Sequence, residues 1–185
     1  MKKLDNSREK FMHVNVDNAS FQMEFDDEYV DKSDLISLTN KFINKSRRFM
    51  CVTRPRRFGK SVTVKMLNAY YSRGCDSKAL FSDLKISSLP DFDKHLNQHD
   101  VIYLDMTEFA DNKDNGNKYL ENLNTDVVSE LKETYKDNFD KDNRYSLPEA
   151  IRCLKGNLFL SLTNGILSLE NTQTTYNYTK NLLTF

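Results

Sequence analysis

The feature that most constrains the fold is the stretch 54–61, which reads Arg-Pro-Arg-Arg-Phe-Gly-Lys-Ser. The residues before it, 50–53, are mostly apolar and partly β-branched, which predicts a short buried strand. The residues after it, 61–70, carry apolar side chains at positions that share one helical face. In the order strand, loop and helix, the loop's N–H groups and the helix N-terminus converge on one anion. The stretch therefore predicts a phosphate-binding loop.

The end of this loop has the chemistry that a nucleotide's phosphates require. Gly59 has no Cβ, so the backbone can approach an oxygen closely and adopt a positive φ. Lys60 would place an ammonium on the outer phosphates, and the hydroxyl of Ser61 would ligate Mg²⁺. The predicted nucleotide-binding residues are Arg54, Arg56, Arg57, Phe58, Gly59, Lys60, Ser61 and Val62.

Two residues depart from the usual Gly-x-x-x-x-Gly-Lys-Ser/Thr pattern. Arg54 stands where the first glycine belongs, and Pro55 fixes φ and removes one N–H donor. This loop is therefore stiffer than a glycine-rich one. The residues alone also fit a basic surface turn at the start of a helix.

The nonapeptide Thr-Arg-Pro-Arg-Arg-Phe-Gly-Lys-Ser at 53–61 resembles the signature of the bacterial AAA-ATPase-like domain family, often fused to a PD-(D/E)XK-type nuclease domain. Three flanking segments are similar to the same family. They are Tyr-Val-Asp-Lys-Ser-Asp-Leu-Ile at 29–36, Met-Leu-Asn-Ala-Tyr-Tyr at 66–71 and Leu-Phe-Ser-Asp-Leu-Lys-Ile at 80–86. The resemblance covers roughly residues 20–160 and implies an ATPase-like domain that takes ATP and Mg²⁺. Arginine commonly stands at the first-glycine position in that family, as Arg54 does here.

A second strand is predicted at 101–106, where the chain is apolar except for Asp105. Because a helical segment connects it to the strand at 50–53, the fold class is α/β. We expect a partial P-loop NTPase-like, three-layer fold with a short parallel sheet flanked by helices. Asp105 would hold Mg²⁺ through water, and Glu108 would orient an attacking water. By the resemblance, the family's acidic motif comes later, so that 101–106 is only the preceding strand.

Helices are predicted in three further places. One begins after Ser33, and another begins at 147–149. A long helix between them carries an apolar stripe with its glutamates outside. The predicted inward residues are Leu35, Leu38 and Phe42, then Leu120, Leu123, Val127, Leu131 and Tyr135, then Ile151, Leu154 and Leu158.

The C-terminal region lacks the acidic motif that the resemblance implies. After Leu160 the chain reads Ser-Leu-Thr-Asn-Gly, with no Asp-Glu pair behind an apolar strand. We therefore divide the chain into an N-terminal arm (1–28), a truncated AAA-ATPase-like P-loop domain (29–165) and a divergent tail (166–185). The expected function is binding of nucleoside triphosphate with little or no hydrolysis, and the sequence leaves open whether this is an enzyme.

Charge distribution supports a different class of function. The net charge is zero, yet 35–75 contains no Asp or Glu and carries ten Lys and Arg residues. Part of this charge suits a helix C-terminus or pairs with acidic residues elsewhere. Alternatively, the basic surface binds nucleic acid or a nucleoprotein complex, as in a phage-type inhibitor of a defence system such as an anti-CRISPR protein. The residues predicted for this role are Arg47, Arg48, Arg54, Arg56, Arg57 and Lys60. A protein-interaction module without a ligand is the third reading.

Three cysteines without CxxC spacing predict a reducing compartment. No export signal and no run of about 18 apolar residues is visible, so a cytoplasmic location away from membranes is expected. By the resemblance, the segments that build an AAA ring are missing. We expect a monomer or a small homo-oligomer.

Overall fold

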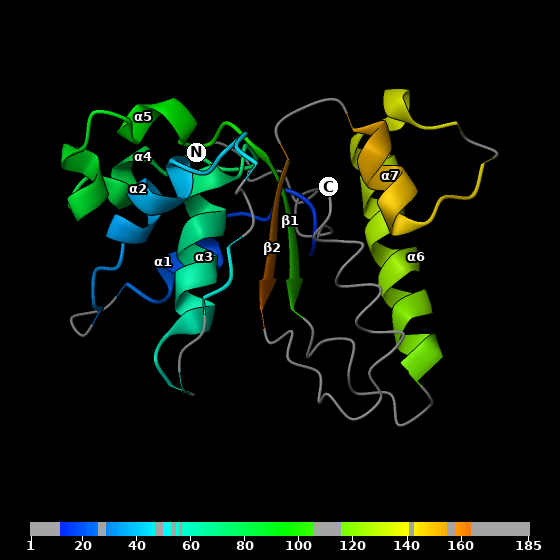
Figure 1. Ribbon diagram of the computed structural model, residues 1–185, viewed down its shortest axis with the longest axis horizontal. Helices are drawn as coiled ribbons and strands as arrows, with labels where there is room; N and C mark the ends of the chain where they lie inside the picture. Colours follow the sequence, from blue (N-terminus) through cyan, green and yellow to red (C-terminus); the bar gives the residue numbers. More distant parts are fainter. Residues whose placement is uncertain are drawn as a thin grey trace, which may run out of the picture.

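The computed structural model describes residues 12–25, 29–46, 50–52, 55, 57–105, 116–140, 143–154 and 158–163, without the side chains of 116–120 and 162–163. These residues form an α/β fold in three layers, with a parallel two-stranded sheet between two groups of helices (Figure 1). One group comprises α1 (Ala19–Gln22), α2 (Asp34–Asn40), α3 (Lys60–Tyr71), α4 (Lys78–Phe81), the 3-10 turn η2 (Lys85–Ser88) and α5 (Phe92–His95). The other comprises α6 (Gly116–Thr134), the 3-10 turn η3 (Lys136–Asn138) and α7 (Leu147–Cys153).

The sheet pairs β1 (Asp100–Asp105) with β2 (Leu158–Thr163) in parallel, with Asp100 opposite Leu158 and Asp105 opposite Thr163. The other edge of β1 meets the N-terminal arm, since Val14 forms an antiparallel bridge with Ile102. The arm thus extends the sheet by a single bridge.

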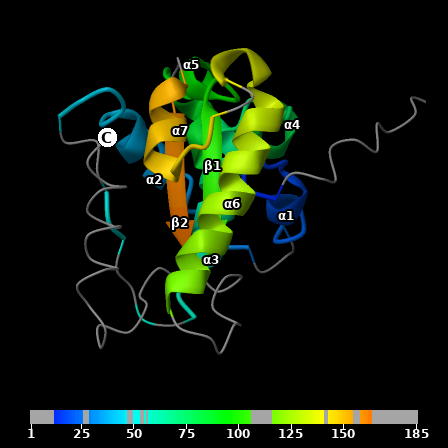
Figure 2. The ribbon, with the colours of Figure 1, turned by 90° about the vertical axis from the view of Figure 1, so that its right-hand side faces the viewer.

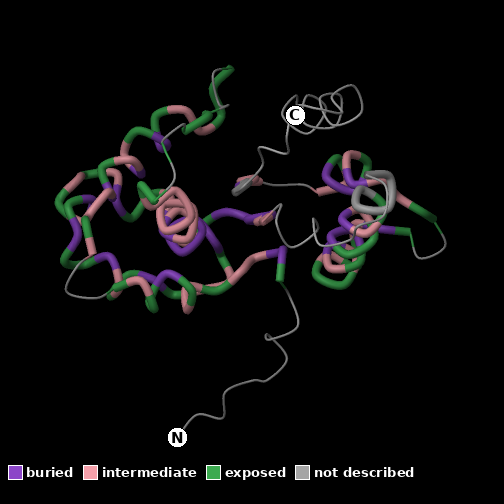
Figure 3. The backbone as a smooth tube through the Cα atoms, turned by 90° about the horizontal axis from the view of Figure 1, so that it is seen from below, coloured by how far each residue is buried: buried purple, intermediate pink, exposed green. Residues whose placement is uncertain are grey.

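Each face of the sheet covers its own hydrophobic cluster. Successive residues of a strand point to opposite faces, so Val101 packs with the α3 cluster and Ile102 with the α6 and α7 cluster. Figure 2 shows α6 and α7 covering one face of β1 and β2. Figure 3 shows α3 from its end, with its buried side turned toward the strands. α3 is thus the central helix of its layer, and its position fixes the loop that precedes it.

The predicted strand at 50–53 is wrong. Residues 50–52 form no strand, Met50 and Val52 are 38% and 47% exposed, and Thr53 lies outside the described residues. The parallel partner of β1 is instead β2, which includes Leu158, a residue predicted to belong to a helix. The physical reason is alternation, because Phe159 packs with the α3 cluster while Leu158 and Leu160 pack with the α6 and α7 cluster.

The helix predictions are largely confirmed. α3 buries Met66 and Ala69, and α6 buries Leu123, Val127 and Leu131. The side chain of Leu120 is not described, Tyr135 is half-buried just beyond α6, and Leu154 is half-buried just beyond α7. α7 begins at a capping box formed by Ser146 and Glu149.

The predicted inner face of α2 is only partly right. Ile36 is fully buried, whereas Leu38, predicted to face inward, is 44% exposed, and Phe42 lies beyond the helix. Ser33 precedes α2 but makes no side-chain cap. Its hydroxyl oxygen instead accepts a hydrogen bond from Ile86 N–H at 3.1 Å, so that tertiary contacts rather than capping orient this helix. The division of the chain at 28 and 165 stays a prediction.

Candidate phosphate-binding site

The loop before α3 turns through two left-handed residues. Arg57 has φ 68° and Gly59 has φ 70°, and α3 begins immediately afterwards at Lys60. A left-handed conformation costs a residue with a Cβ about 1–2 kcal/mol and costs glycine little. Gly59 therefore suits its position, and Arg57 adopts a strained conformation that the surrounding loop must hold. Such strain is frequent at ligand-binding turns.

The N-terminus of α3 presents backbone donors. Its first intrahelical bond runs from Thr63 N–H to Gly59 O at 2.9 Å, and the Thr63 hydroxyl donates to the same oxygen at 2.8 Å. The N–H groups of Lys60, Ser61 and Val62 precede that bond, so the helix itself does not use them. Gly59 supplies no side-chain cap. Together with the helix dipole, these N–H groups form the kind of site that binds phosphate.

Two ammonium groups lie against the loop. Lys60 Nζ donates to Pro55 O at 3.0 Å and so closes the loop on itself. Lys32, from the segment before α2, donates from Nζ to Phe58 O at 3.0 Å. Both lysines are half-buried, whereas Phe58 is 60% exposed. The loop therefore combines positive charge, backbone donors and one exposed aromatic ring.

The loop lies at the end of the molecule where ligands bind in open α/β sheets. α3 runs antiparallel to the strands, so its N-terminus and the carboxyl ends of β1 and β2 share the lower end in Figure 1. Asp105 is half-buried at the carboxyl end of β1, and its Oδ2 accepts a 3.4 Å hydrogen bond from the Tyr103 hydroxyl. A serine hydroxyl and a carboxylate are oxygen ligands of the kind that Mg²⁺ takes, so Ser61 and Asp105 fit that ion chemically. Among the described side chains, no group of three or more His, Cys, Asp or Glu residues forms a metal site.

The predicted site residues divide into three sets, one of which is Asp105 alone at the carboxyl end of β1. Those at 57–62 are brought together in the loop and the first turn of α3. The predicted residues outside the described part of the chain are Arg47, Arg48, Arg54, Arg56 and Glu108.

The family model described as "Predicted AAA-ATPase" matches residues 16–167. The chain belongs to this AAA-ATPase-like family. No curated protein and no solved structure gives a significant match. Of the helices in the described ranges, none combines the length and apolar character needed to cross a bilayer. The match to the AAA-ATPase-like domain does not bear on a fused nuclease domain.

Sequence reasoning missed one residue of this candidate site in the AAA-ATPase-like domain. Lys32 belongs to the 29–36 segment that resembles the family's lead-in, but nothing local to that segment shows that it reaches the loop 26 residues later. The only available signal was the joint resemblance of the two segments to one family.

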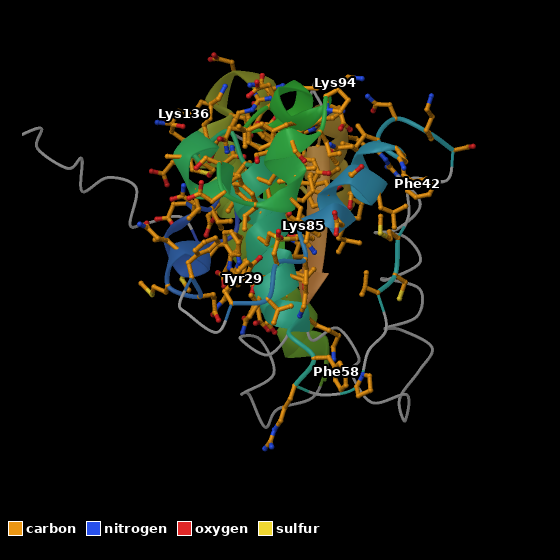
Figure 4. All side chains as sticks on the ribbon, turned by 90° about the vertical axis from the view of Figure 1, so that its left-hand side faces the viewer. Tyr29, Phe42, Phe58, Lys85, Lys94 and Lys136 are labelled. Atoms are coloured by element: carbon orange, nitrogen blue, oxygen red, sulfur yellow. The ribbon has the colours of Figure 1, made fainter. Side chains whose placement is uncertain are left out.

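Sequence reasoning also missed a second, basic feature of the AAA-ATPase-like domain. A cavity of about 450 Å³ lies between the turn after α2 and α5. Its lining residues are Asn40, Lys41, Ile43, Asn44, Lys45, Asp91, Lys94 and His95. Figure 4 shows Lys94 at the opposite end of the molecule from Phe58, so this cavity is separate from the phosphate loop.

The wall of this cavity is rigid on one side. Asn40 is buried, its Oδ1 accepts a hydrogen bond from the Tyr71 hydroxyl at 2.7 Å, and its Nδ2 donates to Asp91 Oδ2 at 3.3 Å. Burial raises the pKa of Tyr71, which stays a neutral donor. Burial and the charge of Lys94 lower the pKa of His95, against the smaller opposing effect of Asp91.

Proposed function

We propose that this AAA-ATPase-like domain binds the phosphates of a nucleoside triphosphate, with Mg²⁺, at the loop 57–62 and hydrolyses it little or not at all. The observation that carries this proposal is the geometry of Gly59, whose left-handed conformation leads straight into an α-helix without a side-chain cap. This places backbone donors and the positive end of the helix dipole at one point.

Several residues of the loop, together with Asp105, have distinct parts in the proposed phosphate binding. The N–H groups of residues 60–62 donate to phosphate oxygens, and Lys60 exchanges its bond to Pro55 O for one to an outer phosphate. Ser61 and Asp105 supply oxygen atoms for Mg²⁺, which neutralises phosphate charge when it is bound. The exposed ring of Phe58 lies beside these donors and can contact the nucleotide outside the phosphates.

The part of the proposal that concerns weak hydrolysis is supported by the carboxyl ends of the two described strands. Phosphoryl transfer to water requires a group that orients the water and groups that stabilise the developing charge. Of the two described strands, β1 ends in Asp105 whereas β2 ends in Thr163 at the matching register position. This arrangement supports binding of the nucleotide over its turnover.

The test compares Lys60→Ala with the wild type in thermal unfolding with ATP and Mg²⁺. A ligand that binds only the folded state stabilises it by about 2.7 kcal/mol at one hundred times its dissociation constant. We expect ATP and Mg²⁺ to raise the unfolding temperature of the wild type and to leave that of Lys60→Ala unchanged. Lys78→Ala, which removes an exposed lysine paired with Asp93, is the matched control and should behave like the wild type. Unchanged nucleotide affinity in Lys60→Ala would reject the proposal.

A second candidate function is binding of nucleic acid, favoured by the basic cavity near α5. Three lysines and one aspartate line it, and Lys41 and Lys45 belong to the stretch 35–75 that has no acidic residue. Lysines arranged in this way neutralise phosphates along a nucleic-acid backbone. The cavity and the phosphate loop are separate, so the two functions have separate tests.

For this candidate, a short labelled RNA is titrated against wild type and Lys41→Ala/Lys94→Ala at several salt concentrations. We expect affinity to fall steeply with salt. In the double variant, the negative slope of log K against log salt should become shallower by about two, because each removed lysine leaves one phosphate without its neutralising charge. Absence of binding at low salt removes this candidate and leaves the first untouched.

A further inference from the structure

The residues on both sides of Lys32, in the segment before α2, accept hydrogen bonds from the backbone of η2. Asp31 Oδ2 accepts a hydrogen bond from Lys85 N–H at 2.9 Å, and the Ser33 hydroxyl accepts one from Ile86 N–H at 3.1 Å. Asp31 Oδ1 also accepts from Ser33 N–H at 2.8 Å. Ser33 and Ile86 are fully buried. The backbone of Lys32 is thus fixed, although its side chain is half-buried.

From this fixed position the side chain of Lys32 reaches the phosphate loop. Its Nζ lies 3.0 Å from Phe58 O. A Cβ built on Gly59 would lie 2.5 Å from the same Nζ, closer than any ordinary contact. The ammonium therefore packs against the backbone of residues 58 and 59. A glycine suits position 59 for two reasons, because it leaves room for this ammonium and because it readily adopts the positive φ found there.

The contact determines which way one peptide group faces. The Phe58–Gly59 bond is trans, and a trans peptide holds its C=O and N–H on opposite sides of the chain. When Lys32 binds Phe58 O on one side, the N–H of Gly59 must point to the other side. A rotated peptide would instead turn the carbonyl oxygen, a partial negative charge, toward that side.

We infer that Lys32 is a positioning residue for the phosphate loop, which holds the Phe58 carbonyl away from the anion and directs the Gly59 N–H toward it. This inference rests on the proposed function, because it assigns the anion to the same loop. Lys60 also donates to a carbonyl of the loop, Pro55 O, but it leaves that oxygen when it binds an outer phosphate, whereas Lys32 keeps its bond to Phe58 O. Lys32 acts through the peptide, and its variants change affinity without removing a group that touches the phosphate.

The test uses Lys32→Met, which keeps the length of the side chain without its charge, and Lys32→Arg, which restores a charged donor. A hydrogen bond to a charged group contributes about 1.5–3 kcal/mol, which predicts roughly a ten- to hundredfold loss of affinity for ATP–Mg²⁺ in Lys32→Met. Lys32→Arg should recover most of that loss. Lys78→Met, an exposed lysine in α4, is the matched control and should bind like the wild type.

A spectroscopic measurement separates this role from a general loss of structure. In ¹⁵N-labelled protein, addition of inorganic tripolyphosphate should shift the Gly59 amide resonance downfield in wild type and Lys32→Arg. The shift should be small in Lys32→Met, while the other amide resonances stay in place. An affinity of Lys32→Met within twofold of wild type, or equal losses in both Lys32 variants, overturns the inference. If the wild type itself binds neither ATP nor tripolyphosphate, the proposed function fails first.

Discussion

The side-chain amide of Asn97 donates a hydrogen bond of 2.7 Å to the carbonyl oxygen of Ser72, the residue that directly follows α3. The same amide donates to Ala69 O at 3.1 Å, and Asn97 itself has φ 54°. A residue from a distant turn thus satisfies carbonyl groups that a helix C-terminus leaves without intrahelical partners.

Asn97→Ala should destabilise the fold by about 2–4 kcal/mol. It removes these hydrogen bonds, and alanine adopts the left-handed conformation less readily than asparagine does. Asn97→Gly keeps the backbone conformation and loses only the amide, so it should cost about half as much. Urea unfolding of both variants measures the difference. Equal losses would show that the backbone conformation contributes nothing.

Gly74→Ala should be more disruptive than its surface position suggests. Gly74 has no positive φ, but an added Cβ would lie 2.3 Å from the carbonyl oxygen of Asn15. The arm must move away, which breaks the bond from Asn15 N–H to Val101 O at 2.7 Å. We expect a loss of about 2 kcal/mol or more. Hydrogen exchange provides the local readout, because the Asn15 amide should exchange faster in the variant while amides in the middle of α6 do not.

Glu130→Ala should release the N-terminal arm from α6. The two carboxylate oxygens of Glu130 accept hydrogen bonds from the backbone N–H groups of Met12, His13 and Val14 at 2.9–3.0 Å. Loss of these bonds to a charged acceptor should cost about 2 kcal/mol in denaturant unfolding. Glu121→Ala, at an exposed position of the same helix, is the control and should change stability by less than about 0.5 kcal/mol.

Asp31→Asn should have an effect that depends on pH. Partial burial pushes the pKa of Asp31 upward, but hydrogen bonds from the N–H groups of Lys85 and Ser33 and from the Ser33 hydroxyl, with the charge of Lys85, lower it on balance. A carboxylate with a lowered folded-state pKa stabilises the fold above its unfolded value of about 3.9, and this contribution is lost as pH falls through the folded value. The variant should therefore be less stable than the wild type by about 1 kcal/mol at pH 7, and the difference should shrink below pH 4. Urea midpoints at pH 7, 5 and 3 test this, and a difference that grows on acidification would contradict it.

The parts of the fold that the sequence predicted correctly are those with long periodic patterns. α3 and α6 carry apolar residues at helical spacing over 12 and 19 residues, and their buried faces follow from that spacing. Leu158 of β2 was misassigned to a helix because a short apolar run fits either a helix or a strand. Residues 50–52 are exposed and form neither, so their apolar pattern alone was misleading. Which run enters the sheet depends on the packing of Phe159 and Leu160 on opposite faces, a tertiary property.

The candidate site shows the same division. The roles of Gly59, Lys60 and Ser61 follow from their chemistry and from the helix that begins there, and these roles stay predictions until binding is measured. The contact of Lys32 with Phe58 O could not be predicted, because a lysine at an irregular position is usually solvated. Glu130 was assigned to the outer face of its helix for the same reason, although it binds the N-terminal arm.

The attachment of the arm also has a consequence for the order of folding. The backbone of residues 12–14 bonds to a side chain 116 to 118 positions later, and Asn15 accepts from Val101 N–H, 86 positions later. Contacts of such long range require closure of large loops and form slowly. During synthesis, this N-terminal segment can pair with β1 before α6 is made, but its acceptor Glu130 is absent until α6 has left the ribosome, so its attachment is completed late.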